Sequence, residues 1–185
     1  MKSQLLERYQ KEIAPSLMKE LSIKNPMELP RIEKIAVNVG AGSYLLRIGK
    51  KSPEEVEEAV AKITGQKPVV RSAKKAVSNF KLREGMPVGV SVTLRNEQAY
   101  NFLDKVINIV FPRVRGFQGV KRNIFDKNGN CAVGFAEHTV FPEINVDDSR
   151  RVHGVQFTIV FSSRNKKHNM KLLENFGFPF KKEKK

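Results

Sequence analysis

Two glycine-containing segments in the first third of the chain are the nearest approach to a nucleotide-binding motif. Gly40-Ala41-Gly42 follows a predicted strand, as in the dinucleotide fingerprint G-x-G-x-x-G, but Leu45 occupies the position of the third glycine. Gly49-Lys50 resembles the end of a phosphate-binding loop, yet six residues separate the preceding glycine from Gly49 where the motif has four, and Lys51 replaces Ser or Thr. Glutamates open the next predicted helix and would repel phosphate. A nucleotide-dependent enzyme using residues 40–50 therefore stands only as the rival hypothesis.

Residues that could bind a metal ion or act as a nucleophile do not form a recognisable site. The segment from Asp126 to Asn130, with Glu137 further on, has part of an EF-hand spacing, but Cys131 stands where that loop requires glycine, which favours a hairpin turn. No histidine has a His or Cys partner at a zinc-binding spacing: His138, His153 and His168. The single cysteine lies on the apolar side of a predicted strand and cannot form an internal disulfide. The sequence therefore predicts no catalytic residue, no metal ion and no cofactor.

A polar face on the predicted sheet is the first feature that indicates binding. Along the predicted strands, large apolar residues alternate with Ser, Thr, Asn, Gln, Gly and Ala, so one face carries short donors and acceptors. The polar positions are Lys34, Asn38, Ser91, Thr93, Arg95, Gln156 and Thr158. An ordinary solvated face would also alternate, but it would tolerate more of the long charged side chains than this face holds. A flat polar surface without aromatic residues for stacking suits the shallow minor groove of an RNA helix better than single-stranded RNA.

A basic segment without acidic residues runs from Lys67 to Arg83. Its basic residues are Lys67, Arg71, Lys74, Lys75, Lys81 and Arg83. Strand patterns stop near Ser72 and resume near Met86, which leaves an unusually long loop with Phe80 inside it. A disordered loop would have the same composition, but loops of this length in compact domains usually have a function. The charge favours contact with phosphates.

A third basic region runs from Arg150 to Lys171. Arg164, Lys166 and Lys167 lie at the start of the last predicted helix, where cations oppose the helix dipole. This placement indicates a partner rather than a contribution to helix stability, although simple solvation of these side chains would also account for it.

Periodicity predicts the elements that position these residues. Period-two alternation predicts strands over residues 31–40, 68–71, 86–95, 131–136 and 154–161. Helical spacing predicts two short helices over residues 3–21, with Pro15 in the first turn of the second, and further helices over 53–64, 96–111 and 165–176. Ser52 and Asn96 are predicted to cap two of these helices, and Pro112 to end one. We expect an α+β fold in which helices cover one face of an antiparallel-rich sheet, as one domain over residues 1–180 with a basic loop at about 71–86 and a basic tail at 181–185.

The overall composition agrees with a basic, folded domain. The 185 residues include 34 Lys or Arg and 19 Asp or Glu, a formal charge of 34 − 19 = +15, and 40% are hydrophobic. That is enough apolar material for a core, and no apolar run reaches the ~20 residues of a membrane span. The first residues become charged too early for a signal peptide, and a lone cysteine favours a reducing compartment. Nucleic acid is the favoured partner of such a basic chain, and an anionic membrane surface is the second.

Several ordered blocks of the chain resemble a known family. They are Pro30-Arg31-Ile32-Glu33-Lys34-Ile35, Asn38-Val39-Gly40, Ile63-Thr64-Gly65-Gln66-Lys67-Pro68-Val69, Phe80-Lys81-Leu82-Arg83-Glu84-Gly85-Met86-Pro87-Val88-Gly89, Val92-Thr93-Leu94-Arg95 and Phe141-Pro142-Glu143-Ile144. Together these blocks resemble the bacterial family of large-subunit ribosomal protein five, and the resemblance runs from about Leu5 to Phe180. The departures are Asn96 where the family often has Gly, an inserted Gly-Lys-Lys-Ser before the acidic helix, and the lysine tail.

The resemblance implies a non-enzymatic structural protein of the ribosome, located in the cytoplasm, that binds 5S rRNA in the central protuberance. It further implies contacts with 23S rRNA, P-site tRNA, neighbouring large-subunit proteins and a head protein of the small subunit, and none with a membrane. By position, Asn38, Gln66 and Thr93 would contact 5S rRNA; the role of Gln66 rests on the resemblance alone. The remaining polar-face residues are assigned to the same site. The loop that would reach tRNA contains Arg71, Lys74, Lys75, Ser78, Asn79, Phe80, Lys81 and Arg83.

Overall fold

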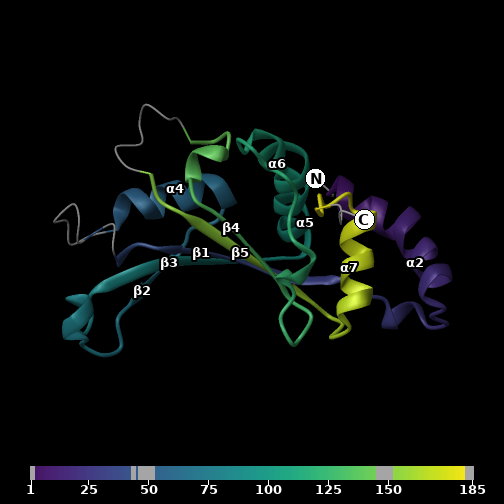
Figure 1. Cartoon of the computed structure of the whole chain (residues 1–185), viewed down its shortest axis with the longest axis horizontal. Coiled ribbons are helices and arrows are strands. Elements are labelled where there is room, and N and C mark those ends of the chain that lie inside the picture. The colour runs from purple at the N-terminus through teal and green to yellow at the C-terminus, as the bar shows by residue number, and fades with distance from the viewer. Residues whose placement is uncertain (1–2, 43–44, 46–52, 145–151, 182–185) are drawn as a thin grey trace. The chain divides into compact units, whose positions relative to one another are not determined.

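The computed structural model describes residues 3–42, 45, 53–144 and 152–181. Its residues form two compact units. Unit 1 contains Met1–Ile35, Leu94–Val133 and Thr158–Lys185, and unit 2 contains Ala36–Thr93 and Gly134–Phe157. The predicted α+β class is confirmed, because the strands form one five-stranded sheet in the order β2-β3-β1-β5-β4 (Figure 1). The domain limits of 1–180 stay a prediction.

The strands lie close to the predicted positions. They are β1 Ile32–Gly40, β2 Val69–Ser72, β3 Pro87–Arg95, β4 Cys131–Phe135 and β5 Val155–Phe161. β2 and β3 form an antiparallel hairpin in which Val69 is opposite Ser91 and Arg71 is opposite Gly89. The end of β1 meets the start of β3, because the Ala41 N–H donates to the Val88 carbonyl over 3.0 Å.

The predicted alternation along the strands is confirmed. In β5, the side chains of Val155, Phe157, Ile159 and Phe161 are buried, whereas Gln156 is exposed and Thr158 is partly exposed. In β1 and β3, Val37 and Val90 are buried, while Asn38 is exposed and Ser91 is partly exposed. β1, β3, β4 and β5 therefore each have one side turned to the core and one accessible side, whereas all four residues of β2 are exposed.

The helices that provide the rest of the core have amphipathic sequences. In unit 2, α4 (Glu54–Thr64) buries its predicted stripe of Val56, Ala59, Val60 and Ile63, and ends at Gly65, whose φ of 69° is left-handed. Pro53 occupies the cap position rather than the first helical position, and the predicted cap Ser52 lies outside the described residues. In unit 1, α7 (Lys166–Asn175) is capped by Asn165, whose side chain accepts a hydrogen bond from the Lys167 N–H.

Two longer helical runs in unit 1 contain proline without breaking. The first consists of α1 (Gln4–Arg8), the π-helical segment η1 (Tyr9–Ile13) and α2 (Ala14–Leu21); the second consists of α5 (Asn96–Lys105), η4 (Val106–Val110) and α6 (Phe111–Arg113). Pro15 lies in the first turn of α2, as predicted, and Pro112 in the first turn of α6. The prediction that Pro112 ends the helix is wrong by a short margin, because the run continues to Arg113. The wider π-turn before each proline accommodates its ring and its missing N–H.

The start of α5 differs from the prediction. Asn96 was expected to be the cap, but the cap residue is Arg95, and Asn96 is the first helical residue with a φ of 51°. Asparagine is among the few residues other than glycine that tolerate this left-handed conformation. The backbone conformation thus explains how Asn can replace the glycine that is frequent at this position in the resembling family.

Short 3-10 turns connect several elements: η2 Pro26–Glu28, η3 Ser78–Phe80, η5 Arg122–Ile124 and η6 His138–Val140. Among the residues described, no helix has the length and apolar character needed to cross a membrane.

Candidate nucleic-acid interface

The hairpin of β2 and β3 carries the basic segment in unit 2. The connection between these strands spans residues 73–86, close to the predicted loop at 71–86. It is not an open loop: the Ala73 N–H donates to the Met86 carbonyl over 2.8 Å, and Val77 and Leu82 form an antiparallel bridge with backbone bonds of 3.0 and 3.1 Å. Backbone pairing therefore continues beyond the strands to a closed end, residues 77–82, which we call the tip.

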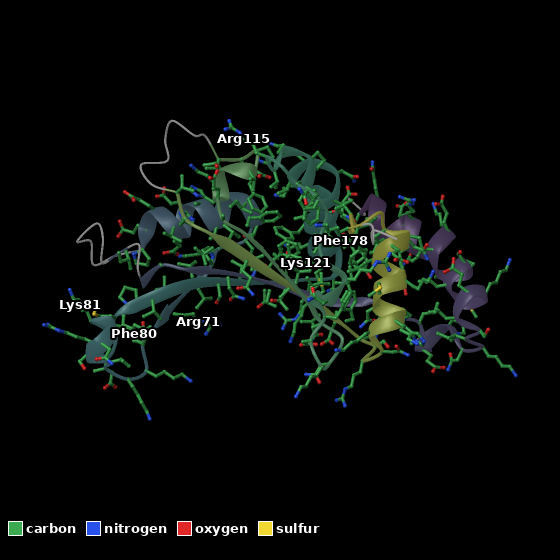
Figure 2. All side chains as sticks on the ribbon, viewed as in Figure 1. Arg71, Phe80, Lys81, Arg115, Lys121 and Phe178 are labelled. Carbon is green, nitrogen blue, oxygen red and sulfur yellow. The ribbon has the colours of Figure 1, made fainter. Side chains whose placement is uncertain are left out.

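The basic side chains from Lys67 to Arg83, and the apolar side chain of Phe80 in the tip, are exposed to solvent. All the predicted basic residues are exposed: Lys67, Arg71, Lys74, Lys75, Lys81 and Arg83. The Phe80 side chain is 69% exposed, although a phenylalanine of this size is usually buried. Ser78 and Asn79 are also exposed and form the η3 turn with Phe80. Figure 2 shows Phe80 and Lys81 at the end of the hairpin, with Arg71 further back along it.

Arg71 belongs to the sheet as much as to the basic segment. It lies within β2, and its Nε atom donates a hydrogen bond to Oγ of Ser91 on β3 over 2.9 Å. The strand register places Val69, Arg71, Gly89 and Ser91 on the same side of the hairpin. The structure thus joins one residue predicted for the loop with one predicted for the polar face.

Sequence reasoning missed Val69 as a member of this surface, which also includes Gly89. Val69 is opposite Ser91 and 54% exposed, so an apolar contact surface adjoins the polar groups. A side chain at Gly89 would place its Cβ only 3.0 Å from the Val39 carbonyl oxygen of β1, so glycine permits the close approach of these strands. Strand alternation pointed to Gly89, but the exposure of Val69 could not be inferred from its residue type.

The remaining polar-face residues of unit 2 are accessible. Asn38 on β1 and Gln156 on β5 are exposed, and Thr93 on β3 is partly exposed. Gln66 is partly exposed in the turn between α4 and β2, where its backbone is held by the Thr64 hydroxyl, which donates to the Gln66 carbonyl over 3.1 Å. The accessible side chains of these residues can donate and accept hydrogen bonds, as 2′-hydroxyl groups and base edges require.

Three predicted site residues belong to unit 1. Lys34 on β1 and Thr158 on β5 are partly exposed, and Arg95 at the end of β3 is exposed. Each occupies the polar side of its strand, as the alternation predicted.

The titratable groups with shifted pKa values are not arranged for catalysis. Burial raises the pKa of the Cys131 thiol to about 12, which keeps it protonated and unreactive. In unit 2, the rings of His138 and His153 stack with their centroids 3.8 Å apart. Burial is the main cause that lowers the pKa of both, that of His153 to about 4, so both rings are neutral near pH 7. Within the described ranges, no group of three His, Cys, Asp or Glu residues is placed to hold a metal ion.

Comparisons with known proteins agree with a ribosomal role. The family model described as "Ribosomal protein L5" matches residues 25–83, and the model described as "ribosomal L5P family C-terminus" matches residues 87–180. The chain is 47% identical over 181 residues to the large ribosomal subunit protein uL5 of Thermotoga maritima, with 96% of each chain covered. It is 46% identical over 183 residues to the uL5 protein of Syntrophotalea carbinolica, covering 99% of this chain and 98% of the relative.

Proposed function

Because the chain belongs to the ribosomal protein L5 family and is thus a structural, non-enzymatic constituent of the large ribosomal subunit, we propose that its polar sheet face binds 5S rRNA. The family resemblance supplies the identity of this RNA. The residues assigned to the contact are Lys34, Asn38, Gln66, Ser91, Thr93, Arg95, Gln156 and Thr158.

The observation that carries the proposal is the hydrogen bond between Arg71 and Ser91 on a strand surface of small residues. It restrains the Arg71 side chain beside Ser91, and Arg71 remains exposed, so its guanidinium group can reach a phosphate. Gly89, opposite Arg71 in the strand register, adds no side chain to this surface. A flat surface with short polar groups matches the wide, shallow minor groove of an RNA helix, which is recognised by shape and through 2′-hydroxyl groups.

The tip has a different composition and is assigned a different partner, the P-site tRNA. Lys81 of the tip, with Lys74 and Lys75 just before it, can contact phosphates, and the exposed Phe80 can stack on a base or sugar. The residues of this contact are Arg71, Lys74, Lys75, Ser78, Asn79, Phe80, Lys81 and Arg83. Arg71 is assigned to this contact, and its hydrogen bond to Ser91 also joins it to the residues assigned to 5S rRNA. The further assigned partners are 23S rRNA, neighbouring large-subunit proteins and a head protein of the small subunit, all in cytoplasmic ribosomes.

The test is an equilibrium titration of the purified full chain with 5S rRNA, with an unrelated RNA of the same length as the competitor. We expect preferential 5S binding that survives a high-salt wash, because groove contacts depend less on counterion release than phosphate contacts do. Equal affinity for both RNAs, lost together in high salt, would contradict the proposal. The rival nucleotide-dependent enzyme predicts retention of ATP or GTP in a filter assay; its segment 40–50 lies mostly outside the described residues.

A further inference from the structure

A second basic surface lies in unit 1, on residues that the proposed function does not assign. The turn Asp126–Asn130 precedes β4, and the segment 162–165 joins β5 to α7 (Figure 1). A Cβ atom at Gly129 would lie 2.8 Å from Nδ2 of Asn169 and 2.9 Å from the Arg164 carbonyl oxygen. The turn and the start of α7 are therefore in direct contact, although they are far apart in the sequence.

A buried side chain clamps these two segments together. Asn169 of α7 is fully buried, and its Nδ2 atom donates to the Gly129 carbonyl over 3.0 Å and to the Ser163 carbonyl over 2.8 Å. Buried hydrogen bonds of this kind fix geometry, because breaking either would leave a polar group unsatisfied. The basic side chains carried by the two segments are consequently held on a preorganised backbone.

Four cations gather on this clamped backbone, and we call them the α7 cluster: Lys127, Arg164, Lys166 and Lys167. All four are exposed. In the part of the chain that the structure describes, none of the four forms an ion pair within the 4.0 Å limit. The first turn of α7 contains no acidic residue. Cations at this end of a helix oppose its dipole, so the cluster costs stability that a partner could offset.

The nearest acid, Asp126, is occupied by its own turn. Its Oδ1 atom accepts from the N–H groups of Asn128 and Asn130 over 2.8 and 2.7 Å, and its Oδ2 atom accepts from Nδ2 of Asn130 over 3.1 Å. The carboxylate closes the turn and keeps its negative charge, which interacts electrostatically with Lys166. The four cations of the cluster still outnumber this one neighbouring anion, so an excess of positive charge remains.

We propose that the α7 cluster is a second RNA-binding surface that contacts the backbone phosphates of an RNA segment other than the one held by the polar face. Arg and Lys on a fixed backbone are the usual ligands of phosphodiesters, and a member of a ribosomal family with a charge of +15 is assembled among such groups. The cluster consists of four cations and contains no aromatic residue, so it positions an RNA backbone rather than reading its sequence. The proposal goes beyond 5S recognition and rests only on family membership and on the clamped cluster.

The experiment measures the affinity of the full chain for a labelled A-form RNA duplex of unrelated sequence, first alone and then with 5S rRNA added. The test variant is Lys127→Gln/Arg164→Gln/Lys166→Gln/Lys167→Gln. The control removes the same charge from exposed positions outside the cluster: Lys19→Gln/Lys24→Gln/Lys62→Gln/Arg113→Gln. We expect the test variant to bind the duplex at least about tenfold more weakly, with the slope of log K against log salt shallower by about 3, and the control to change little. In each protein, 5S affinity should stay within about threefold.

Three outcomes would overturn the proposal: equal loss in test and control variants, unchanged duplex binding in the test variant, or a parallel loss of 5S affinity. Thermal melts establish that each variant is folded. If the test variant is unfolded, Lys166→Gln/Lys167→Gln replaces it, with Lys19→Gln/Lys24→Gln as its control, and the same outcomes decide. If wild-type protein shows no preference for 5S rRNA while duplex binding still depends on the cluster, the proposed function fails and this inference stands.

Discussion

The Nε atom of Arg71 on β2 donates a hydrogen bond to Oγ of Ser91 on β3 over 2.9 Å. This contact lies where the basic hairpin joins the polar face, and it restrains a long cation that would otherwise sample many rotamers. Restraint of this kind lowers the entropy cost of binding, because the guanidinium group is already oriented before RNA arrives.

The contact predicts energetic coupling between the two residues in RNA binding. Arg71→Ala and Ser91→Ala should each weaken 5S binding, and the double variant should lose less than the sum, with a coupling energy of ~0.5–1.5 kcal/mol. A double-mutant cycle measured by gel-shift titration tests this. Strict additivity of the two losses would show that Ser91 does not position Arg71.

Truncating the polar face should weaken binding while leaving the fold unchanged. Asn38→Ala and Thr93→Ala remove accessible side chains, so neither should create a core cavity, and each should cost ~1–3 kcal/mol of 5S affinity. Thermal melts and gel shifts of the same preparations give both quantities. A lower melting temperature with unchanged affinity would contradict the assignment of the faces.

The opposite face should behave in the reverse way. Val37 and Val90 are 0% and 1% exposed, so Val37→Asp or Val90→Asp would place an unpaired charge in the core. We expect either variant to be insoluble or unfolded, as judged by circular dichroism of the soluble fraction; Val69→Asp at an exposed position is the matched control and should fold. A soluble, folded Val37→Asp protein that had lost only its affinity for RNA would mean that the core face and the RNA-binding face of the sheet were assigned the wrong way round.

The lysines between β2 and β3 should contribute little to 5S binding. Lys74, Lys75 and Lys81 are exposed, so replacing all three with Ala should keep the fold and leave 5S affinity within about threefold. Ribosomes assembled with this variant should release P-site tRNA faster, with a shallower salt dependence, because fewer counterions are displaced. The measurement is tRNA dissociation at two salt concentrations. Collapse of 5S binding with unchanged tRNA release would assign the tip to the 5S site instead.

The stacked histidines predict a loss of stability in mild acid. Burial lowers the pKa of His153 from 6.5 to about 4 and also lowers that of His138. The unfolded chain takes up protons below pH 6.5 while the folded chain resists them, so stability is complete above that pH and falls as the pH drops toward about 4. Urea unfolding at pH about 7.5 and about 5 should show a smaller difference for His138→Gln/His153→Gln than for wild type. His168→Gln on α7 is the control; a double variant as acid-sensitive as wild type would contradict the prediction.

Local patterns were sufficient to predict the faces of the strands and most helix limits. The alternation around Val37 and Asn38, or around Val90 and Ser91, follows from the two-residue period of any strand and needs no knowledge of neighbours. The end of α4 at Gly65 follows from backbone chemistry within one turn, whereas Asn165, predicted as the first residue of the last helix, is its cap. The blocks that resemble the ribosomal family are likewise properties of the linear chain.

Contacts between distant residues were decided only by the tertiary structure. The register of β2 against β3 brings Arg71 to Ser91. Packing in unit 2 stacks the ring of His138 on that of His153. In unit 1, Asn169 joins the turn at Gly129 to the start of α7. None of these contacts has a period or a fixed spacing, because register and packing depend on how whole elements meet. The sequence by itself therefore determined which residues of most strands face solvent, and the tertiary structure decided which basic side chains are carried on segments that contact one another.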